Sequence, residues 1–274
     1  MGLTFLDVAV EAARRAGDLI REKAYQTKQV KQKTSASDLV TEVDQRSEEI
    51  IRDIILRHFP DHAILGEEGV AAGDKTVEEV WEESRQHEYV WIVDPIDGTS
   101  NFVHGFPFFC VSIALAKNGE LITGVIYEPM RDELFTAEKG KGAYLNGQPI
   151  RVSGEETLAE SLMATGFSYG QRRVQQQLRT LMRTAPRFRS LRNGGAAALH
   201  LAYIAAGRLT GYWELGLNPW DLAAGVLLVK EAGGEVTDTW GRPFDLTVRN
   251  TLATNGKVHR EMVELLRESQ ADVT

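Results

Sequence analysis

The sequence predicts a fold that mixes helices and strands, with an α+β N-terminal half and an α/β C-terminal half. Three observations support this prediction. The chain begins with two amphipathic helical segments, and strand-like segments with tight-turn signals dominate from residue 89 to about residue 150. From about residue 160 onward, strand-like and helical segments alternate, which is typical of α/β structure.

The N-terminal half begins with two segments in which apolar residues recur at helical spacing. They predict helices at residues 3–25 and 41–58. Strands are then predicted at residues 63–66, 89–94, 108–116, 122–127 and 134–137. Asn118-Gly119 and Asn146-Gly147 are typical of two-residue hairpin turns, so we expect hairpins at these two places.

The C-terminal half alternates between the two kinds of element. Strands are predicted at residues 161–165, 188–192, 209–214, 235–238 and 251–254. Helices are predicted at residues 171–184, 196–206, 219–232 and 257–268. This alternation indicates a mixed or parallel sheet. We place a boundary near residue 150, after the last predicted hairpin, which divides the chain into residues 1–150 and 151–274.

Composition and charge argue against several classes of protein. The 274 residues include 31 Lys+Arg and 39 Asp+Glu, a net charge of −8. An acidic protein is a poor default binder of nucleic acid or of an anionic membrane. No apolar stretch approaches the roughly 20 residues that are needed to span a bilayer. The single cysteine, Cys110, cannot form an intramolecular disulfide, which fits the reducing cytoplasm.

One segment departs from this acidic average. Between Glu160 and Glu214 the sequence contains eight arginines and no acidic residue, so the segment carries a charge of +8. Two interpretations are equally open: a solvated face with structural arginines, or a basic rim that attracts an anionic ligand. The arginines are Arg172, Arg173, Arg179, Arg183, Arg187, Arg189, Arg192 and Arg208.

The most informative segment follows the predicted strand at residues 89–94. Asp94 ends this strand, Pro95 is expected to stop it, and Asp97 comes two residues later. Two carboxylates at a strand end can converge on one cation, and the Ile96 carbonyl is a candidate third oxygen ligand. Carboxylates, water and phosphate oxygens suit Mg²⁺. The six histidines are scattered along the chain, which argues against zinc.

The next two residues favour an anion site beside this cation. If Gly98 and Thr99 open a helix, their amides can bind a phosphate group. The alternative is structural, with Asp97 or Thr99 as a helix cap and Asp94 as its neighbour.

Two further acidic positions weaken the structural alternative. Glu67 and Glu68 follow the predicted strand at residues 63–66, and Asp221 lies at the start of the apolar helix at residues 219–232. Asp221 alone could simply complement the helix dipole. Three separate acidic termini instead suggest a shared site for more than one metal ion, which suits phosphoryl transfer.

At these motifs the sequence resembles the inositol monophosphatase family, the Mg²⁺-dependent, lithium-sensitive sugar phosphatases. The matching segments are DLVTEVDQ at 38–45, GEE at 66–68, WIVDPIDGTSNFVHGFPFFCVSIAL at 91–115, KGKGAYLNGQPI at 139–150 and WDLAAGVLLVKEAGG at 220–234. The resemblance implies a layered αβαβα fold, a homodimer, and hydrolysis of phosphomonoesters by metal-activated water. It also implies that residues 1–150 form a metal-binding half and residues 151–274 a substrate-recognition half.

Carried over to this sequence, the resemblance implies two main metal positions. Glu67, Asp94 and the Ile96 carbonyl resemble the ligands of the first ion. Asp94, Asp97 and Asp221 resemble the ligands of the second ion. Glu67 also resembles a residue that faces a weaker third ion. The implied cofactor is therefore two or three Mg²⁺ ions.

The residues implied as catalytic are Glu67, Thr99 and Asp44. Thr99 resembles the hydroxyl that orients the attacking water together with Asp44. The amides of Gly98 and Thr99 resemble the donors to the phosphate group. Asp44 also has a structural interpretation, because it lies at the start of a predicted helix, where an acidic residue is favoured.

The implied substrate contacts match the family less closely. Glu214 resembles a carboxylate that accepts hydrogen bonds from substrate hydroxyls, which suits a polyol. Gly195, Ala196 and Ala197 resemble a loop beside the substrate, but Ala196 stands where many members carry Ser or Thr. Only backbone contacts therefore remain at that position. The other implied substrate contacts are Ile96, Asp97, Gly98, Thr99 and Asp221.

The leading hypothesis is a phosphatase of inositol 1-phosphate or a similar polyol phosphate. Members of the same superfamily act on fructose 1,6-bisphosphate, NADP or 3′-phosphoadenosine 5′-phosphate. The basic segment keeps these substrates open, because a second phosphate needs a cationic partner. Glu214 argues against them, because a carboxylate repels a second phosphate. A non-catalytic regulatory or RNA-binding protein is a third hypothesis, disfavoured because the carboxylates and Thr99 are all present.

Overall fold

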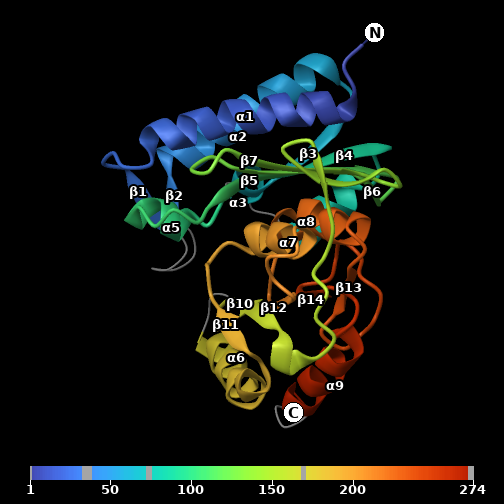
Figure 1. Cartoon of the computed structure of the whole chain (residues 1–274). Coiled ribbons are helices and arrows are strands. Elements are labelled where there is room, and N and C mark those ends of the chain that lie inside the picture. The colour runs from blue at the N-terminus through green and yellow to red at the C-terminus, as the bar shows by residue number, and fades with distance from the viewer. Residues whose placement is uncertain (1, 33–38, 72–75, 168–170, 271–274) are drawn as a thin grey trace.

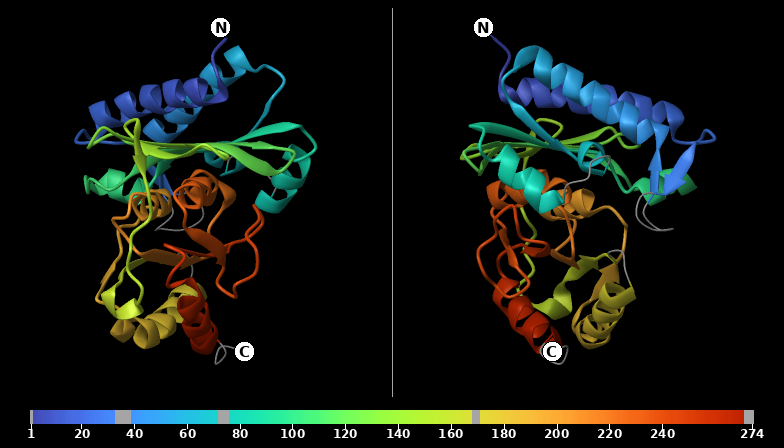
Figure 2. Two further views of the ribbon diagram at one scale, coloured as in Figure 1. Left: turned by 45° about the vertical axis from the view of Figure 1, so that its right-hand side comes forward. Right: turned by 180° about the vertical axis from the view of Figure 1, so that it is seen from behind.

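The structure, a computed structural model, describes residues 2–32, 39–71, 76–167 and 171–270. It forms five layers in the order helix, sheet, helix, sheet, helix, with α1 and α9 at opposite ends of the stack (Figure 1). Two further views show the same layers from other directions (Figure 2). The predicted layered αβαβα fold is therefore confirmed.

Helices α1 (Phe5–Lys23) and α2 (Glu42–His58) form the first layer and cover one face of the larger sheet (Figure 1). Each helix begins with a capping box, in which a threonine and an aspartate three residues later bind each other's backbone amide. Their buried residues recur at helical spacing and pack toward the sheet. Both predicted N-terminal helices are confirmed.

The larger sheet contains seven strands in the order β3-β4-β5-β6-β7-β8-β9. The bounds are β3 Ala63–Gly66, β4 Tyr89–Asp97, β5 Cys110–Lys117, β6 Glu120–Glu128, β7 Glu133–Glu138, β8 Gly142–Leu145 and β9 Gln148–Ile150. Strands β3 and β4 are parallel, and the later neighbours are antiparallel. Asn118 and Asn146 have φ of 50° and 49° and precede glycines with positive φ, as two-residue hairpin turns require. The predicted hairpins are confirmed.

Strand β4 differs from the prediction at Pro95. We expected the strand to stop there, but β4 continues to Asp97 across a shift in register. Asp94 pairs with Ser112 and Asp97 pairs with Cys110. A bulge of this kind leaves Pro95 outside the ladder, so its missing N–H costs no hydrogen bond. The expectation of a strand end was wrong, and both aspartates belong to one irregular strand.

Helices α7 (Ala197–Ala205) and α8 (Pro219–Glu231) form the middle layer between the two sheets (Figure 1). Nearly all of their residues are buried, as expected for apolar helices covered on both sides. Small residues permit this close packing. A Cβ on Gly225 would lie 2.4 Å from the Leu201 side chain, and one on Gly124 would lie 3.0 Å from the Ala224 carbonyl oxygen.

The second sheet contains five strands in the order β11-β10-β12-β14-β13. The bounds are β10 Leu162–Thr165, β11 Ser190–Arg192, β12 Gly211–Leu215, β13 Glu235–Asp238 and β14 Asn250–Thr254. Strand β10 is parallel to β11 and β12, whereas β14 is antiparallel to β12 and β13. Helices α6 (Gln171–Thr184) and α9 (His259–Gln270) form the outer layer. The predicted mixed sheet is confirmed.

Shorter elements connect these layers, and two of them directly follow β3 and β4. Helix α3 (Glu67–Ala71) directly follows β3, and α5 (Thr99–His104) starts just after β4. A small antiparallel pair, β1 (Val30–Gln32) and β2 (Leu39–Thr41), leads into α2. Helix α4 (Val77–Ser84) precedes β4. Two short 3₁₀ helices occupy Leu158–Glu160 and Ala185–Arg187. Because β3 and β4 are parallel neighbours with Gly66 paired to Val93, Glu67 and Asp94 leave the larger sheet at the same end.

The two halves of the chain share a hydrophobic core. The larger sheet ends at Ile150 and the second sheet begins at Leu162. One buried cluster nevertheless includes Leu65, Ala224 and Ala253, and so extends from the larger sheet through the middle helices to the second sheet. The division into a metal-binding half and a substrate-recognition half stays a prediction.

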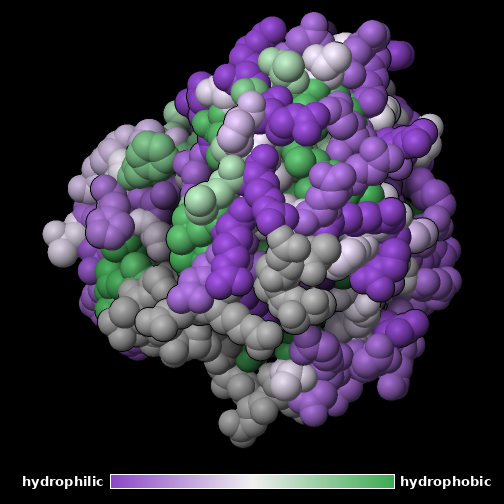
Figure 3. Space-filling view, turned by 90° about the horizontal axis from the view of Figure 1, so that it is seen from below, coloured by the Kyte–Doolittle hydropathy of each residue, from purple (hydrophilic) through white to green (hydrophobic). Residues whose placement is uncertain are grey.

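The surface carries the expected mixture of charged groups. Seen from the side of α6 and α9, it is mostly hydrophilic, with smaller hydrophobic patches (Figure 3). Some arginines of the basic segment form ion pairs, with Arg208 bound by both guanidinium ends to Glu133 at 2.6 and 2.7 Å and Arg187 3.1 Å from Glu261. These pairs support the structural interpretation for part of that segment. Among the helices that the structure describes, none combines the length and apolar character that crossing a membrane requires.

Candidate active site

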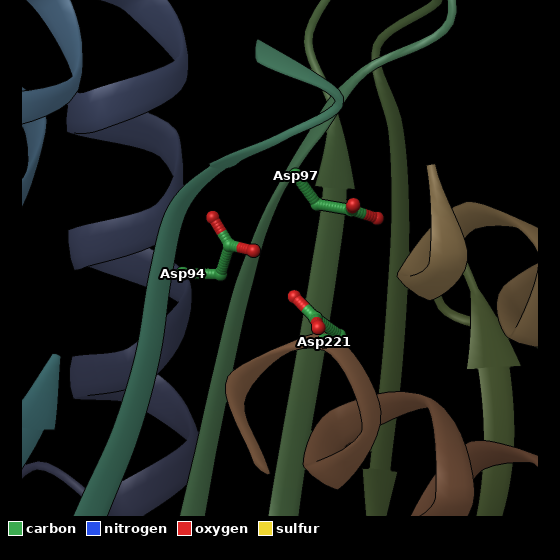
Figure 4. Close-up of side chains that lie close together, drawn as sticks. All are labelled: Asp94, Asp97 and Asp221. Carbon is green, nitrogen blue, oxygen red and sulfur yellow. The ribbon is translucent and has the colours of Figure 1, made fainter. Parts of the chain in front are cut away.

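Three aspartates converge where β4 ends and α8 begins. Asp94 and Asp97 lie on β4, and Asp221 lies in the first turn of α8 (Figure 4). One carboxylate oxygen of each residue lies within 4.8 Å of those of the other two. Asp94 and Asp97 are buried, and Asp221 is partly exposed. Residues far apart in sequence thus present three carboxylates to one point.

Backbone amides hold two of these carboxylates in place. The Ile96 amide donates to Asp94 Oδ1 at 3.0 Å. The Asn218 amide donates to Asp221 Oδ2 at 2.7 Å, as part of the capping box of α8. Asp221 therefore caps α8, as the structural interpretation expected. The capping bond uses Oδ2 only and does not involve Oδ1.

Asp97 connects the two halves of the chain. Its Oδ1 accepts the Ala197 amide at 3.2 Å, and its Oδ2 accepts the Ala198 amide at 2.7 Å. Both amides lie in the first turn of α7, where the helix dipole favours an anion. The Ala197 amide, which the sequence placed beside the substrate, is therefore already bound to a carboxylate of the larger sheet.

Burial and crowding raise the pKa values of all three aspartates. Burial, followed by the charges of Glu67 and Asp97, raises the pKa of Asp94 well above its ordinary value. Burial, followed by the charges of Asp97 and Glu67, likewise raises the pKa of Asp221. Burial raises the pKa of Asp97 to about 7, although the two α7 amides oppose the shift. A divalent cation would offset this repulsion, so the donor set fits a hard metal ion such as Mg²⁺.

Glu67 faces the same cluster from the start of α3. Its charge contributes to the raised pKa of Asp94, Asp97 and Asp221. Its side chain also forms a hydrogen bond with Asp94, which is one cause of the raised pKa of that aspartate. The structure therefore brings all four predicted acidic ligands together.

Thr99 and Asp44, which the family resemblance assigns to a shared role, are in direct contact. Thr99 Oγ1 lies 3.1 Å from Asp44 Oδ1 and 3.0 Å from the Ile96 carbonyl oxygen. Asp44 Oδ2 accepts the Thr41 amide at 2.8 Å within the capping box of α2. The two interpretations of Asp44 are thus compatible, because each uses a different carboxylate oxygen.

Gly98 forms the left-handed turn between β4 and α5. Its φ is +92°, a region that residues with a Cβ rarely adopt. A Cβ at this position would also lie 2.9 Å from the Phe108 carbonyl oxygen. Helix α5 starts at Thr99, so the amides of Gly98 and Thr99 lie at the start of a helix, as the predicted phosphate site requires.

Glu214 approaches the same cluster from the end of β12. It is 8% exposed, and the Tyr212 hydroxyl donates a hydrogen bond to its Oε2. Burial raises the pKa of Glu214 to about 7, with a further contribution from the charge of Asp221. Its carboxylate packs so closely on Gly166 that a Cβ there would overlap it. Glu214 is therefore a buried carboxylate beside the three aspartates, held by a different partner.

Two residues that the sequence did not single out hold the predicted substrate loop. Asn101 Nδ2 donates to the Phe108 carbonyl at 2.6 Å and to the Gly194 carbonyl at 2.7 Å. The Gly194 amide donates to His200 Nε2 at 3.1 Å. Burial lowers the pKa of His200 to about 3, so its imidazole is neutral and can accept. The sequence signal for Asn101 was its place in the matching segment 91–115, three residues after Gly98.

One arginine of the basic segment lies near Glu214. A Cβ on Gly216 would lie 2.7 Å from the Arg173 guanidinium, and Gly216 itself has φ of +81°. Arg173 thus contacts the turn before α8, whereas Arg187 and Arg208 form ion pairs, and the rim interpretation stays a prediction.

Comparisons with known proteins agree with these motifs. A profile of the inositol monophosphatase family matches residues 3–271. The chain is similar to inositol monophosphatase 2 of Solanum lycopersicum, with 45% identity over 269 residues that cover 97% of this chain and 99% of that protein. It is similar to the Nus factor SuhB of Pasteurella multocida, with 39% identity and 97% coverage of both. The solved structure of an IMPase from Thermotoga maritima matches with a TM-score of 0.87 and 38% identity, over 98% of this chain and 99% of that one.

Proposed function

The chain belongs to the inositol monophosphatase family and is a phosphatase, and from that premise we propose that it hydrolyses inositol 1-phosphate to inositol and phosphate with Mg²⁺ as cofactor. The observation that carries this proposal is the convergence of Asp94, Asp97 and Asp221, with Glu214 beside them. The three carboxylates suit the metal ions, and Glu214 suits the hydroxyls of a polyol.

In this proposal, two groups of ligands hold two Mg²⁺ ions, and Glu67 faces a third. Glu67, Asp94 and the Ile96 carbonyl hold the first ion. Asp94, Asp97 and Asp221 hold the second. When bound, Mg²⁺ lowers the pKa of water and offsets charge on phosphate oxygens. The raised pKa values of the three aspartates support this assignment, because a cation would offset the repulsion that disfavours their ionised forms.

Thr99 and Asp44 orient the attacking water in the proposed reaction. The Thr99 hydroxyl has a single hydrogen, and its two neighbours, Asp44 Oδ1 and the Ile96 carbonyl oxygen, are both acceptors. The hydroxyl hydrogen is therefore donated to one of these acceptors. The lone pairs of Oγ1 remain available to accept a hydrogen bond from water. As the water hydrogen passes to Thr99 Oγ1, the Thr99 hydroxyl hydrogen would pass to Asp44 Oδ1, so the Asp44 carboxylate takes up the proton. The amides of Gly98 and Thr99 bind the phosphate oxygens.

Glu214 recognises the alcohol part of the substrate in this proposal. A carboxylate only accepts hydrogen bonds when ionised, and Tyr212 occupies one position on Oε2. Oε1 and the remaining lone pair are available to polyol hydroxyls. Gly195, Ala196 and Ala197 contribute backbone contacts only, with the Ala197 amide shared with Asp97. We further propose a homodimer, which the family resemblance supports, and a cytoplasmic location, which the single free Cys110 supports.

The test is phosphate release by the purified protein with Mg²⁺, compared by kcat/KM across four substrates. These are inositol 1-phosphate, fructose 1,6-bisphosphate, NADP and 3′-phosphoadenosine 5′-phosphate. We expect a clear preference for inositol 1-phosphate. A preference for a bisphosphate or nucleotide would overturn the substrate assignment and give Arg173 the second phosphate as its partner. Absence of release from all four would overturn catalysis and favour a regulatory role.

A further inference from the structure

Helix α2 presents two buried carboxylates, one helical turn apart, toward the candidate site. Asp44 and Glu48 are four residues apart, so their side chains lie on the same face of the helix. They are 1% and 4% exposed. Asp44 reaches Thr99, as described above. Glu48 reaches a different segment of the site, the turn from β3 into α3 that carries Glu67.

Glu48 binds the first amides of α3. Its Oε2 accepts the Glu68 amide at 2.8 Å, and its Oε1 accepts the Gly69 amide at 3.1 Å. Both carboxylate oxygens are therefore engaged on the same short segment. Among the residues that the structure describes, the ion-pair partner of Glu48 is Arg52, whose Nη1 lies 3.9 Å from Oε1 and whose side chain is 40% exposed. The hydrogen bonds to the amides, not the ion pair, fix the carboxylate.

Gly66 leaves the room that this contact needs. A Cβ on Gly66 would lie 2.5 Å from the Glu48 carboxylate, closer than any real contact. The residue before Glu67 is thus packed against Glu48, and the residue after Glu67 is hydrogen-bonded to it. The backbone of Glu67 is held from both sides by one carboxylate of α2.

We propose that Glu48 is a positioning residue that orients Glu67 toward the metal cluster. This inference rests on the proposed function, in which Glu67 is a ligand of the first Mg²⁺ ion. Asp44 and Glu48 then act as a pair: one helix face sets the position of Thr99 through Asp44 and of Glu67 through Glu48. Helix α2 fixes the spacing between the water-orienting hydroxyl and the metal ligand.

The test is the variant Glu48→Gln. A glutamine has one acceptor oxygen, so it can bind one of the two amides, while its NH₂ group faces the other N–H. We expect Mg²⁺ binding to the substrate-free protein, measured by calorimetry, to weaken about tenfold, as is typical when a residue that orients a metal ligand is changed. The Mg²⁺ concentration for half-maximal activity should rise by the same factor, with kcat at saturating Mg²⁺ close to wild type.

Gly66→Ala provides a second approach to the same contact. The variant keeps Glu48, but the added methyl group pushes the Glu48 carboxylate away from the amides of Glu68 and Gly69. It should therefore weaken Mg²⁺ binding as Glu48→Gln does. Two controls separate positioning from general stability. Arg52→Gln removes the distant ion pair and should leave Mg²⁺ binding unchanged. Asp7→Asn weakens an exposed carboxylate–amide cap in α1, away from the site, and should lower Tm alone.

Each outcome decides the proposal. Unchanged Mg²⁺ binding in both Glu48→Gln and Gly66→Ala would overturn it, as would a loss of kcat without a change in Mg²⁺ affinity. Mg²⁺ binding by the wild type without phosphate release would overturn the proposed function alone, and the calorimetry would still test Glu48. A wild type that binds no Mg²⁺ would overturn both.

Discussion

The two sides of the candidate site are held in different ways. On the metal side, Asp94, Asp97 and Asp221 each accept hydrogen bonds from backbone amides. On the substrate side, Glu214 is held by another side chain, the Tyr212 hydroxyl. A backbone amide is present whatever residue occupies its position, proline excepted. The fold itself therefore fixes the metal side, whereas single substitutions can change the substrate side.

This difference separates the chemistry from the choice of substrate. A change on the metal side should affect every phosphomonoester alike, because all share the phosphate group. A change on the substrate side should affect only those substrates whose alcohol part contacts it. Asp97 and Asn101 connect the sides through the first turn of α7 and the Gly194 carbonyl. The following predictions test whether the separation holds.

The largest effect is expected for Asp94→Asn on the metal side. The asparagine oxygen can still accept the Ile96 amide, and the lost charge relieves repulsion from the neighbouring carboxylates. The variant should therefore fold normally. Because metal ions contribute several kcal/mol to such reactions, kcat/KM should fall by about 10³-fold or more on every substrate.

The measurement is phosphate release from inositol 1-phosphate and from an aryl phosphate, with circular dichroism to verify folding. Asp18→Asn serves as a matched control, since Asp18 lies on the surface and pairs with Arg21. Loss of activity on one substrate only would break the comparison, because the metal side would then discriminate among substrates. Near-normal turnover would refute the metal assignment itself.

A smaller and more selective effect is expected for Glu214→Gln on the substrate side. The change removes a charged acceptor but keeps an oxygen for the Tyr212 hydroxyl. A hydrogen bond to a charged group contributes about 1.5–3 kcal/mol, so kcat/KM for inositol 1-phosphate should fall roughly 10- to 100-fold. An aryl phosphate has no hydroxyl to donate, and its hydrolysis should change little.

The ratio of the two kcat/KM values measures this selectivity directly. Glu264→Gln, which alters an exposed glutamate paired with Arg260, should leave the ratio unchanged. Equal losses on both substrates would remove Glu214 from recognition. They would also indicate that its charge acts on the metal side, through Asp97 and Asp221.

Features with a local signal could be predicted from the sequence. Helical periodicity located α1 and α2, and the Asn-Gly pairs located two hairpins. The proximity of Asp94 and Asp97 followed from their spacing at one strand end. Their proximity to Asp221 did not follow from spacing, because it depends on α8 packing against β4 and β5. That link needed the hypothesis of a shared metal site and the family resemblance.

Other features depend on contacts that no local pattern encodes. The continuation of β4 past Pro95 requires a partner strand that accepts a bulge. In the sequence, Glu48 is one more acidic residue on an amphipathic helix. Its contact with the amides of Glu68 and Gly69 arises only when α2 lies across the end of β3. Its spacing of four residues from Asp44 was the available signal.

The smallest effect concerns stability and pH, and it sharpens the comparison within one experiment. The pKa values of Asp97 and Glu214 are about 7 in the folded, metal-free chain, against ordinary values of 3.8 and 4.5. Between about pH 4 and pH 7, the unfolded chain has therefore released protons that the folded chain still binds. These two groups lower the free energy of unfolding as pH rises through this range and together outweigh His200, whose lowered pKa acts in the opposite direction below about pH 6.5. In EDTA, Tm should be lower at about pH 8 than at about pH 5, by roughly 2–4 °C for each kcal/mol lost.

Mg²⁺ should restore only the part of this loss that belongs to the metal side. A cation that binds the ionised aspartates stabilises the folded chain, so the rise in Tm on adding Mg²⁺ should be larger at the higher pH. Glu214 is not a proposed ligand, so its part of the loss should persist with Mg²⁺ and disappear in Glu214→Gln. A Tm in EDTA that does not fall with pH would contradict the raised pKa values. If Mg²⁺ restored the whole loss of Tm in the wild type, the metal ions would also influence the ionisation of Glu214. The metal side and the substrate side would then not be separate.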